Sequence, residues 1–177
     1  MLKENIEKAL NEQIAMEGNA SFFYLSMASW CEQGGLEGSA KFMHRQSDEE
    51  RAHMLRIFNY INEVDGHAIT PAIKQPPLQF ESVRSLFSEV YEHEKKVTAS
   101  INSLVDMCYE ENDYGTLNFL QWYIQEQREE EALMRTIIDK IKLIGDGPQS
   151  LFYIDKEVEK INKLAEKEEA ADEMNEG

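Results

Sequence analysis

The feature that most constrains the fold is a set of four long apolar seams with heptad-like spacing, each interrupted near its middle by a polar residue. In the clearest case, Glu50 and His53 lie one helical turn apart and point the same way, between apolar seam positions such as Met43 and Ile57. A stripe of this spacing is the face that a helix buries in a bundle. The sequence therefore predicts an all-α four-helix bundle that carries polar groups inside its core.

The three other seams are interrupted at comparable positions, by Glu17, by Glu94, and by the pair Gln127 and Glu130. The same number of residues, 33, separates Glu17 from Glu50 and Glu94 from Gln127. If each pair of helices folds back at a tight turn, the partners differ in height by only about 4.5 Å, at about 1.5 Å of rise per residue. We therefore expect the polar residues of all four seams in one layer of the core.

Several carboxylates in one buried layer are unfavourable, by several kcal/mol per ion, unless each charge is compensated. The seams offer no Lys or Arg at these positions, and a single imidazole cannot neutralise three or four carboxylates. A metal ion can, and oxygen-rich ligands with one imidazole suit iron or manganese. A Glu from each of two helices together with Glu-x-x-His is the ligand set of di-iron carboxylate bundles. The pattern predicts a dinuclear metal site, with a metal-free polar layer as the alternative.

The composition argues against several classes of function. The chain of 177 residues has 34 Asp and Glu against 18 Lys and Arg, a net charge of −16, whereas a nucleic-acid partner requires a basic surface. No apolar run is long enough to span a membrane. The N-terminus has no apolar run behind a basic start, so no signal peptide is expected. Cys31 and Cys108 lie far apart on the seams, as expected for buried thiols in a reducing compartment. We expect one cytoplasmic domain with no nucleic-acid or membrane partner.

Five helices are predicted, over about residues 2–32, 36–64, 81–111, 113–143 and 148–165. The proline-containing stretch 66–80 has no helical period, and at about 3.3 Å per residue it extends to roughly 50 Å. That length matches the roughly 42 Å of a helix of about 28 residues, so the second and third helices are expected to be parallel, as in bundles with one long crossover. Residues 1–165 form the expected domain, and the acidic residues 166–177 are expected to be a disordered tail.

The fifth predicted helix carries an apolar stripe at Leu151, Ile154, Val158, Ile161 and Ala165. A closed four-helix bundle has no groove that could bury such a stripe. The stripe is therefore expected to pack on the end of the bundle or against copies of the same chain, and we favour the copies.

Together these elements resemble a bacterial non-haem ferritin over about residues 1–165. The resemblance rests on acidic, amide, imidazole and phenol side chains at matching spacings, namely Glu17, Tyr24, Glu49, Glu50, His53, Glu94, Glu126, Gln127, Glu129 and Glu130. It implies a ferritin-like four-helix bundle with one long crossover between the second and third helices and a short fifth C-terminal helix. It also implies a hollow homo-oligomeric shell of 24 subunits, with the fifth helix along the fourfold axes.

The resemblance implies two neighbouring iron positions in the bundle. The first would be held by Glu17, Glu50 and His53. The second would be held by Glu94 with help from Gln127 and Glu130, and Glu50 would bridge the two. Because Gln127 carries no charge, the second iron is expected to be held more loosely, as suits a site that oxidises iron and passes it on.

A third iron site of the bacterial branch is also implied, and its ligands would be Glu49, Glu126, Glu129 and Glu130. Tyr24 would lie beside the iron pair and could supply an electron or a hydrogen bond. Bacterioferritins bind haem through a Met at the position that Ala52 occupies here, so no haem is expected. The implied function is iron storage and detoxification, in which a ferroxidase converts Fe(II) to Fe(III) with O₂ or H₂O₂ and deposits ferric mineral in the shell.

Three other functions remain open at this stage. A rubrerythrin-like di-iron oxidase or peroxidase would share the bundle, although the chain has no Cys-x-x-Cys pair for a rubredoxin centre. A DNA-protecting mini-ferritin would place its ligands at a subunit interface and usually lacks the fifth helix. A metal-free helical scaffold would oligomerise through that helix. Of the remaining polar and aromatic residues, Trp122 is assigned to packing, and His44, His67 and His93 are assigned to the solvated surface.

Overall fold

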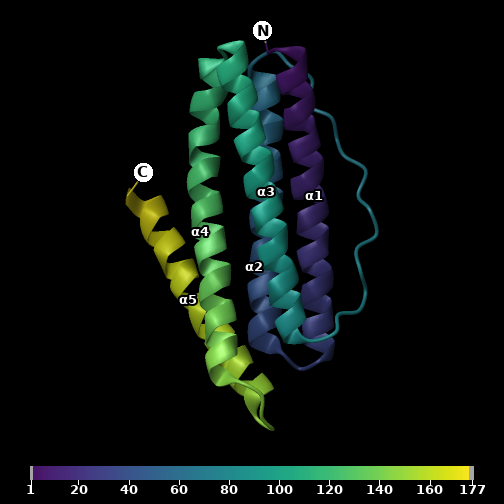
Figure 1. Ribbon diagram of the computed structural model, residues 1–177, viewed down its shortest axis with the longest axis vertical. Coiled ribbons are helices and arrows are strands. Elements are labelled where there is room, and N and C mark those ends of the chain that lie inside the picture. The colour runs from purple at the N-terminus through teal and green to yellow at the C-terminus, as the bar shows by residue number, and fades with distance from the viewer. Residues whose placement is uncertain (1, 176–177) are drawn as a thin grey trace.

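The computed structural model describes residues 2–175, with side chains described for residues 2–167. This part of the chain is all-α, with α1 (Glu4–Gln33), α2 (Glu37–Glu63), α3 (Val83–Glu111), α4 (Tyr114–Ile144) and α5 (Ser150–Asn175). The first four helices form an elongated bundle, and α5 folds back beside it (Figure 1). The predicted fold class, a four-helix bundle with a fifth C-terminal helix, is confirmed. Among the described residues, no helix combines the length and the apolarity that crossing a bilayer requires.

The bounds of α1 to α4 differ from the predicted ones by at most two residues, but α5 is longer than predicted. It continues to Asn175, well beyond the expected end at Ala165. The residues after Ala165 are mainly Glu, Ala and Lys, which are strong helix formers, so the helix propagates without an apolar stripe. The structure thus has helix where the sequence predicted a disordered tail, and residues 176–177 of that tail lie outside the described residues.

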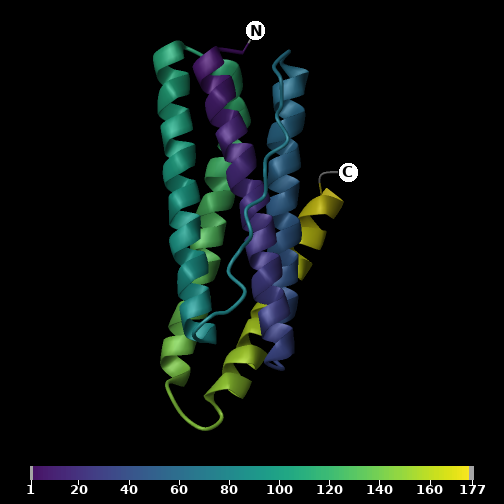
Figure 2. The same ribbon diagram turned by 90° about the vertical axis from the view of Figure 1, so that its right-hand side faces the viewer.

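The segment between α2 and α3 runs along the bundle beside α1, so that α2 and α3 are parallel (Figure 2). Side chains of α1 hold its backbone: Asn11 Oδ1 accepts a hydrogen bond of 2.7 Å from Ile69 N, and Asn19 Oδ1 accepts one of 2.8 Å from Lys74 N. Gly18 lies between these two contacts, and a Cβ atom there would come within 3.1 Å of Ile73 Cδ1. The small residue lets the crossover pack directly on the helix.

The apolar core is divided into two clusters by the polar layer. One cluster contains residues from Ala20 to Met43 in α1 and α2, and the other contains residues such as Leu10 and Ile57 on the opposite side of Glu17 and Glu50. The same division occurs in α3 and α4, because Glu94, Gln127 and Glu130 fall between the two clusters there. Burial of apolar surface on both sides supplies the stability that offsets a polar layer inside the bundle.

The fifth helix packs against α2 and α4 of its own chain, beside α4 in Figure 1 and beside α2 in Figure 2. Ile154 and Val158 of its apolar stripe are buried in the core, so the favoured expectation that the stripe meets other copies is wrong for these two residues. The physical reason is that α5 folds back and packs against α2 and α4 of its own chain. Leu151, by contrast, is exposed.

A carboxylate of α5 also satisfies the start of α2. Leu36, at the N-cap of α2, provides no side-chain cap. Asp155 replaces it from α5, because its two carboxylate oxygens accept hydrogen bonds from Gly38 N at 3.0 Å and from Ser39 N at 2.7 Å. A buried carboxylate at a helix N-terminus is favoured both by these bonds and by the helix dipole.

Candidate metal centre

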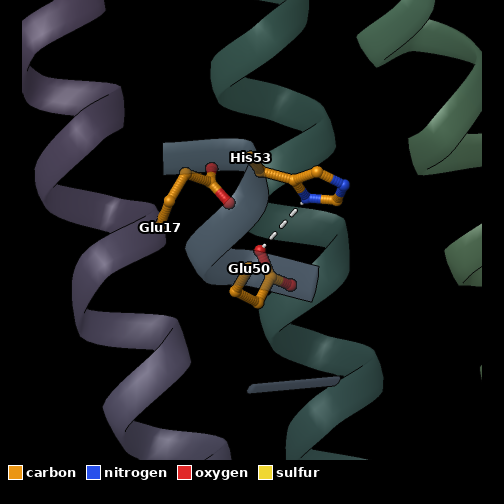
Figure 3. Close-up of side chains that lie close together, drawn as sticks. All are labelled: Glu17, Glu50 and His53. Carbon is orange, nitrogen blue, oxygen red and sulfur yellow. Dashed lines mark ion pairs between the residues drawn. The ribbon is translucent and has the colours of Figure 1, made fainter. Parts of the chain in front are cut away.

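Glu17 on α1 and the pair Glu50 and His53 on α2 converge in the polar layer (Figure 3). All three side chains are buried, and one ligand atom from each lies within 4.8 Å of the others. His53 Nδ1 is 3.4 Å from Glu50 Oε2, as the i, i+3 spacing on one helix face requires. We call Glu17, Glu50 and His53 the inner group.

Several buried atoms of this layer have no hydrogen-bond partner in the described part of the chain. Among them are Glu17 Oε2, His53 Nδ1 and Glu130 Oε2. A buried polar atom left unpaired costs about 1–3 kcal/mol, and native proteins rarely leave several together. Carboxylate oxygens together with an imidazole nitrogen form a donor set that suits iron. Glu17 and His53 belong to the inner group, and with the carboxylate of Glu50 they fit a metal ion there.

Glu94 lies in the same layer but is bound by protein donors. Gln127 Nε2 donates to Glu94 Oε2 at 3.2 Å, and the Tyr24 hydroxyl donates to Glu94 Oε1. Burial acts to raise the pKa of Glu94, but hydrogen bonds from His93 and Tyr24 outweigh it, and the pKa is lowered. The protein's own donors thus favour the negatively charged form of Glu94.

Glu50 and Glu130 behave in the opposite way. Burial, reinforced by the charges of Glu17 and Glu94, raises the pKa of Glu50 well above its usual value. Burial and the charge of Glu49 do the same to the pKa of Glu130. Closely spaced carboxylates in a dry core cannot all ionise together. Burial and mutual repulsion therefore favour the protonated forms of Glu50 and Glu130, whereas a bound cation would favour their ionised forms.

A second cluster lies next to the inner group and shares its imidazole. Ligand atoms of Glu49, His53 and Glu126 lie within 4.8 Å of one another, and His53 Nε2 is 3.9 Å from Glu126 Oε2. We call these three residues the outer group. Of the four residues expected at a third iron site, Glu49 and Glu126 come together here. Glu130 is buried in the polar layer, and Glu129 is exposed.

The side chain of Glu129 accepts a hydrogen bond from Gln125 on its own helix. Glu129 belongs to neither group of potential ligands among the described residues. The structure therefore does not bring Glu129 to the outer group.

Sequence reasoning did not assign His93, Gln13 or Gln46 to the site, although all three contact its residues. His93, expected to be solvated, is half-buried with its Nδ1 3.2 Å from the Tyr24 hydroxyl. That expectation was wrong, because a residue beside a seam position can still face the neighbouring helix. Gln13 donates to Glu17, and Gln46 Nε2 donates to Glu49 Oε2 at 2.8 Å. Both glutamines interrupt the seams, and this polar placement is the signal that could have found them.

A family model described as Ferritin-like domain matches residues 7–144 of the chain. The chain belongs to the ferritin family. A Bacterial non-heme ferritin of Campylobacter jejuni is 45% identical over 161 residues, which cover 91% of this chain and 96% of the relative. A Probable bacterial non-heme ferritin-like protein of Haemophilus influenzae is 43% identical over 165 residues, covering 93% of this chain and all of the relative.

Solved structures of ferritins agree with the fold. An open pore ferritin from the hyperthermophilic archaeon Archaeoglobus fulgidus superposes with a TM-score of 0.86 at 40% identity, covering 90% of this chain and 98% of that one. A ferritin of Chlorobium tepidum gives a TM-score of 0.81 at 38% identity, with 89% and 97% coverage. Because each match covers about nine-tenths of this chain, it extends past residue 144 and includes part of α5.

Proposed function

We propose that this ferritin stores iron and detoxifies it, acting as a ferroxidase on Fe(II) as substrate. The observation that carries the proposal is the convergence of buried ligand atoms of Glu17, Glu50 and His53, in a layer where Glu17, His53 and Glu130 each keep a buried polar atom without a hydrogen-bond partner among the described residues. Such a cluster is costly for a merely structural core. Binding of cations compensates this cost, and the names of the relatives support iron as the cation.

The chemistry assigned to the layer is the oxidation of two ferrous ions. Glu17, Glu50 and His53 would hold the first ion, and Glu50 would bridge to a second ion at Glu94, Gln127 and Glu130. Each Fe(II) gives up one electron, and one O₂ takes both electrons with two protons to form H₂O₂, or one H₂O₂ takes them to form two H₂O. The carboxylates favour the more highly charged ferric product electrostatically.

The residues of the layer would keep this chemistry orderly. Gln127, which is neutral, donates to Glu94 rather than adding charge, so the second ion is held less tightly and can leave. The Tyr24 hydroxyl lies against Glu94 and could supply a hydrogen bond or an electron. Burial and the neighbouring carboxylates raise the pKa of Tyr24, which keeps the phenol protonated. The outer group would receive a third iron through Glu49 and Glu126.

The proposed assembly is a homo-oligomeric shell, of 24 subunits, that encloses the ferric mineral. Support comes from large apolar side chains that remain exposed on the described part of the subunit, namely Phe22, Leu25, Leu78, Leu151, Phe152 and Tyr153. A single subunit that exposes this much apolar surface is expected to bury part of it against copies. The proposed location is the cytoplasm, with a role in iron homeostasis.

The test is aerobic addition of several hundred Fe(II) per shell to metal-free protein, followed by size-exclusion chromatography. The proposal predicts that ferric iron stays soluble and elutes with a particle much larger than a subunit. Oxidation that stops at a few irons per subunit, with further iron precipitating, would instead favour a di-iron oxidase that does not store iron.

A further inference from the structure

Arg45 of α2 connects the fifth helix to the outer group. Its guanidinium Nε donates to Asn162 Oδ1 at 2.8 Å, and its Nη1 donates to Glu49 Oε2 at 3.1 Å. The side chain of Arg45 is only 13% exposed. The planar guanidinium can hold both partners at once, in fixed directions, because its N–H donors form a rigid fork.

Asn162 is well placed to fix one end of this connection. It is buried, and its Nδ2 donates to Glu166 Oε1 at 2.8 Å, one turn further along α5. The helix that carries it is anchored to α2 by the bonds from Gly38 and Ser39 to Asp155. The position of Arg45 therefore depends on how α5 is docked.

The other end of the connection bears on metal binding. Glu49 Oε2 accepts hydrogen bonds from both Arg45 and Gln46, so this oxygen already has two donors. A cation bound at the outer group would share Glu49 with a fixed positive charge. One positive charge about 6 Å from a divalent ion changes its affinity on the order of tenfold even at the dielectric constant of water.

We propose that Arg45 is a positioning residue, held by Asn162, that competes with metal for Glu49 and thereby keeps cations at the outer group weakly bound. The inference rests on the proposed function, because it assigns the outer group to iron in transit. Weak retention lets iron pass onward after oxidation, and the docking of α5 sets how weak it is.

The test uses the assembled, metal-free protein with Zn(II), a redox-inert probe, titrated by isothermal titration calorimetry. Glu49→Gln identifies the binding event that belongs to the outer group, because that event is lost in the variant. Arg45→Gln is expected to tighten this event on the order of tenfold, whereas Arg45→Lys, which keeps the charge but loses the fork that also holds Asn162, is expected to tighten it by a smaller factor. In Glu49→Gln protein, adding Arg45→Gln should change nothing further.

Asn162→Ala tests the link to α5. It should tighten Zn(II) binding at the outer group by a smaller factor. In protein that already carries Arg45→Gln it should have no effect, as expected for residues that act through one chain of contacts. If Arg45→Gln does not assemble, Asn162→Ala and Arg45→Lys still decide the question.

Unchanged or weaker Zn(II) binding in Arg45→Gln would overturn the proposed competition. An unchanged affinity in Asn162→Ala would overturn the role of α5. Failure of the proposed function has a different signature, since Zn(II) would then show no binding event that Glu50→Ala removes from wild-type protein.

Discussion

His53 Nε2 lies 3.9 Å from Glu126 Oε2, while the other ring nitrogen of the same imidazole faces Glu50 at 3.4 Å. One histidine therefore joins the inner group to the outer group. Its two nitrogens face separate carboxylates, as in metal sites where a carboxylate orients a ligating imidazole. Substitutions of Glu50 therefore test the inner group, and substitutions of Glu126 test the outer group.

Glu126→Gln should reduce the fast phase of Fe(II) oxidation from about three to about two irons per subunit, because the outer group loses one charged oxygen ligand. The matched control is Glu129→Gln, since Glu129 is exposed and lies outside both groups. Stopped-flow absorbance at increasing ratios of iron to subunit gives the number directly. An equal loss in the control would mean that Glu129 also holds iron.

Glu50→Gln should stabilise the metal-free protein while it impairs oxidation. A carboxyl group whose pKa is higher in the folded than in the unfolded chain binds more protons when folded, so the free energy of unfolding falls as pH rises from the ordinary value, 4.5, through the raised pKa. Because Gln does not ionise, Glu50→Gln removes this pH-dependent fall in the free energy of unfolding. At pH 7 the expected gain is about 1–3 kcal/mol, the scale of one uncompensated buried polar group.

Urea unfolding at equal protein concentration, at pH 5 and at pH 7.5, checks this prediction. The gain from Glu50→Gln should be larger at pH 7.5, and added Zn(II) should reverse the order in favour of wild type. A variant that is less stable than wild type at both pH values would show that the carboxyl group is structural.

Asp155→Ala should lower the free energy of unfolding by about 1–2 kcal/mol, as for the loss of a good helix N-cap. The reason is that α2 loses the acceptor of the Gly38 and Ser39 amides. Asp139→Ala is a suitable control, because the Asp139 side chain is 69% exposed on α4. Thermal unfolding of both variants measures the difference, and equal effects would contradict the role of Asp155.

Gly38→Ala should weaken the docking of α5, since an added Cβ would lie 2.3 Å from the backbone oxygen of Asp155. Backbone cannot yield as a flexible side chain would, so one of the two helices must shift. Gly115→Ala is the matched control, because its Cβ would meet only Asp113 Oδ1, at 3.6 Å. Hydrogen exchange of α5 amides should rise in the first variant alone.

The seam pattern was sufficient to predict the bundle, because the burial of apolar side chains decides which face of each helix points into the core. It also predicted that Glu17, Glu50 and Glu94 share a layer, and all three are buried between the two apolar clusters. The spacing of residues along a helix fixes direction and height, which is why these predictions needed no structure.

The seam pattern could not predict the contacts that lie outside the seams. The docking of α5 depends on Gly38 and on Asp155, which lie far apart in sequence and follow no shared period. The distinction between Glu126 and Glu129 depends on rotation about α4, since both belong to the same charged run. Side-chain partners of this kind are set by tertiary packing rather than by local sequence.

The measurement that tests the central claim most directly is the rate of aerobic Fe(II) oxidation by metal-free protein, with Glu50→Ala and Glu12→Ala alongside. Glu12 is an exposed carboxylate of α1, with its side chain 70% exposed, so Glu12→Ala makes the same substitution without touching the buried layer. We expect rapid oxidation of about two to three irons per subunit in wild type and in Glu12→Ala, and loss of the fast phase in Glu50→Ala, because the bridging ligand of a two-metal site is removed. If all three proteins oxidise iron alike, the buried carboxylate layer is structural and the proposed ferroxidase centre is wrong.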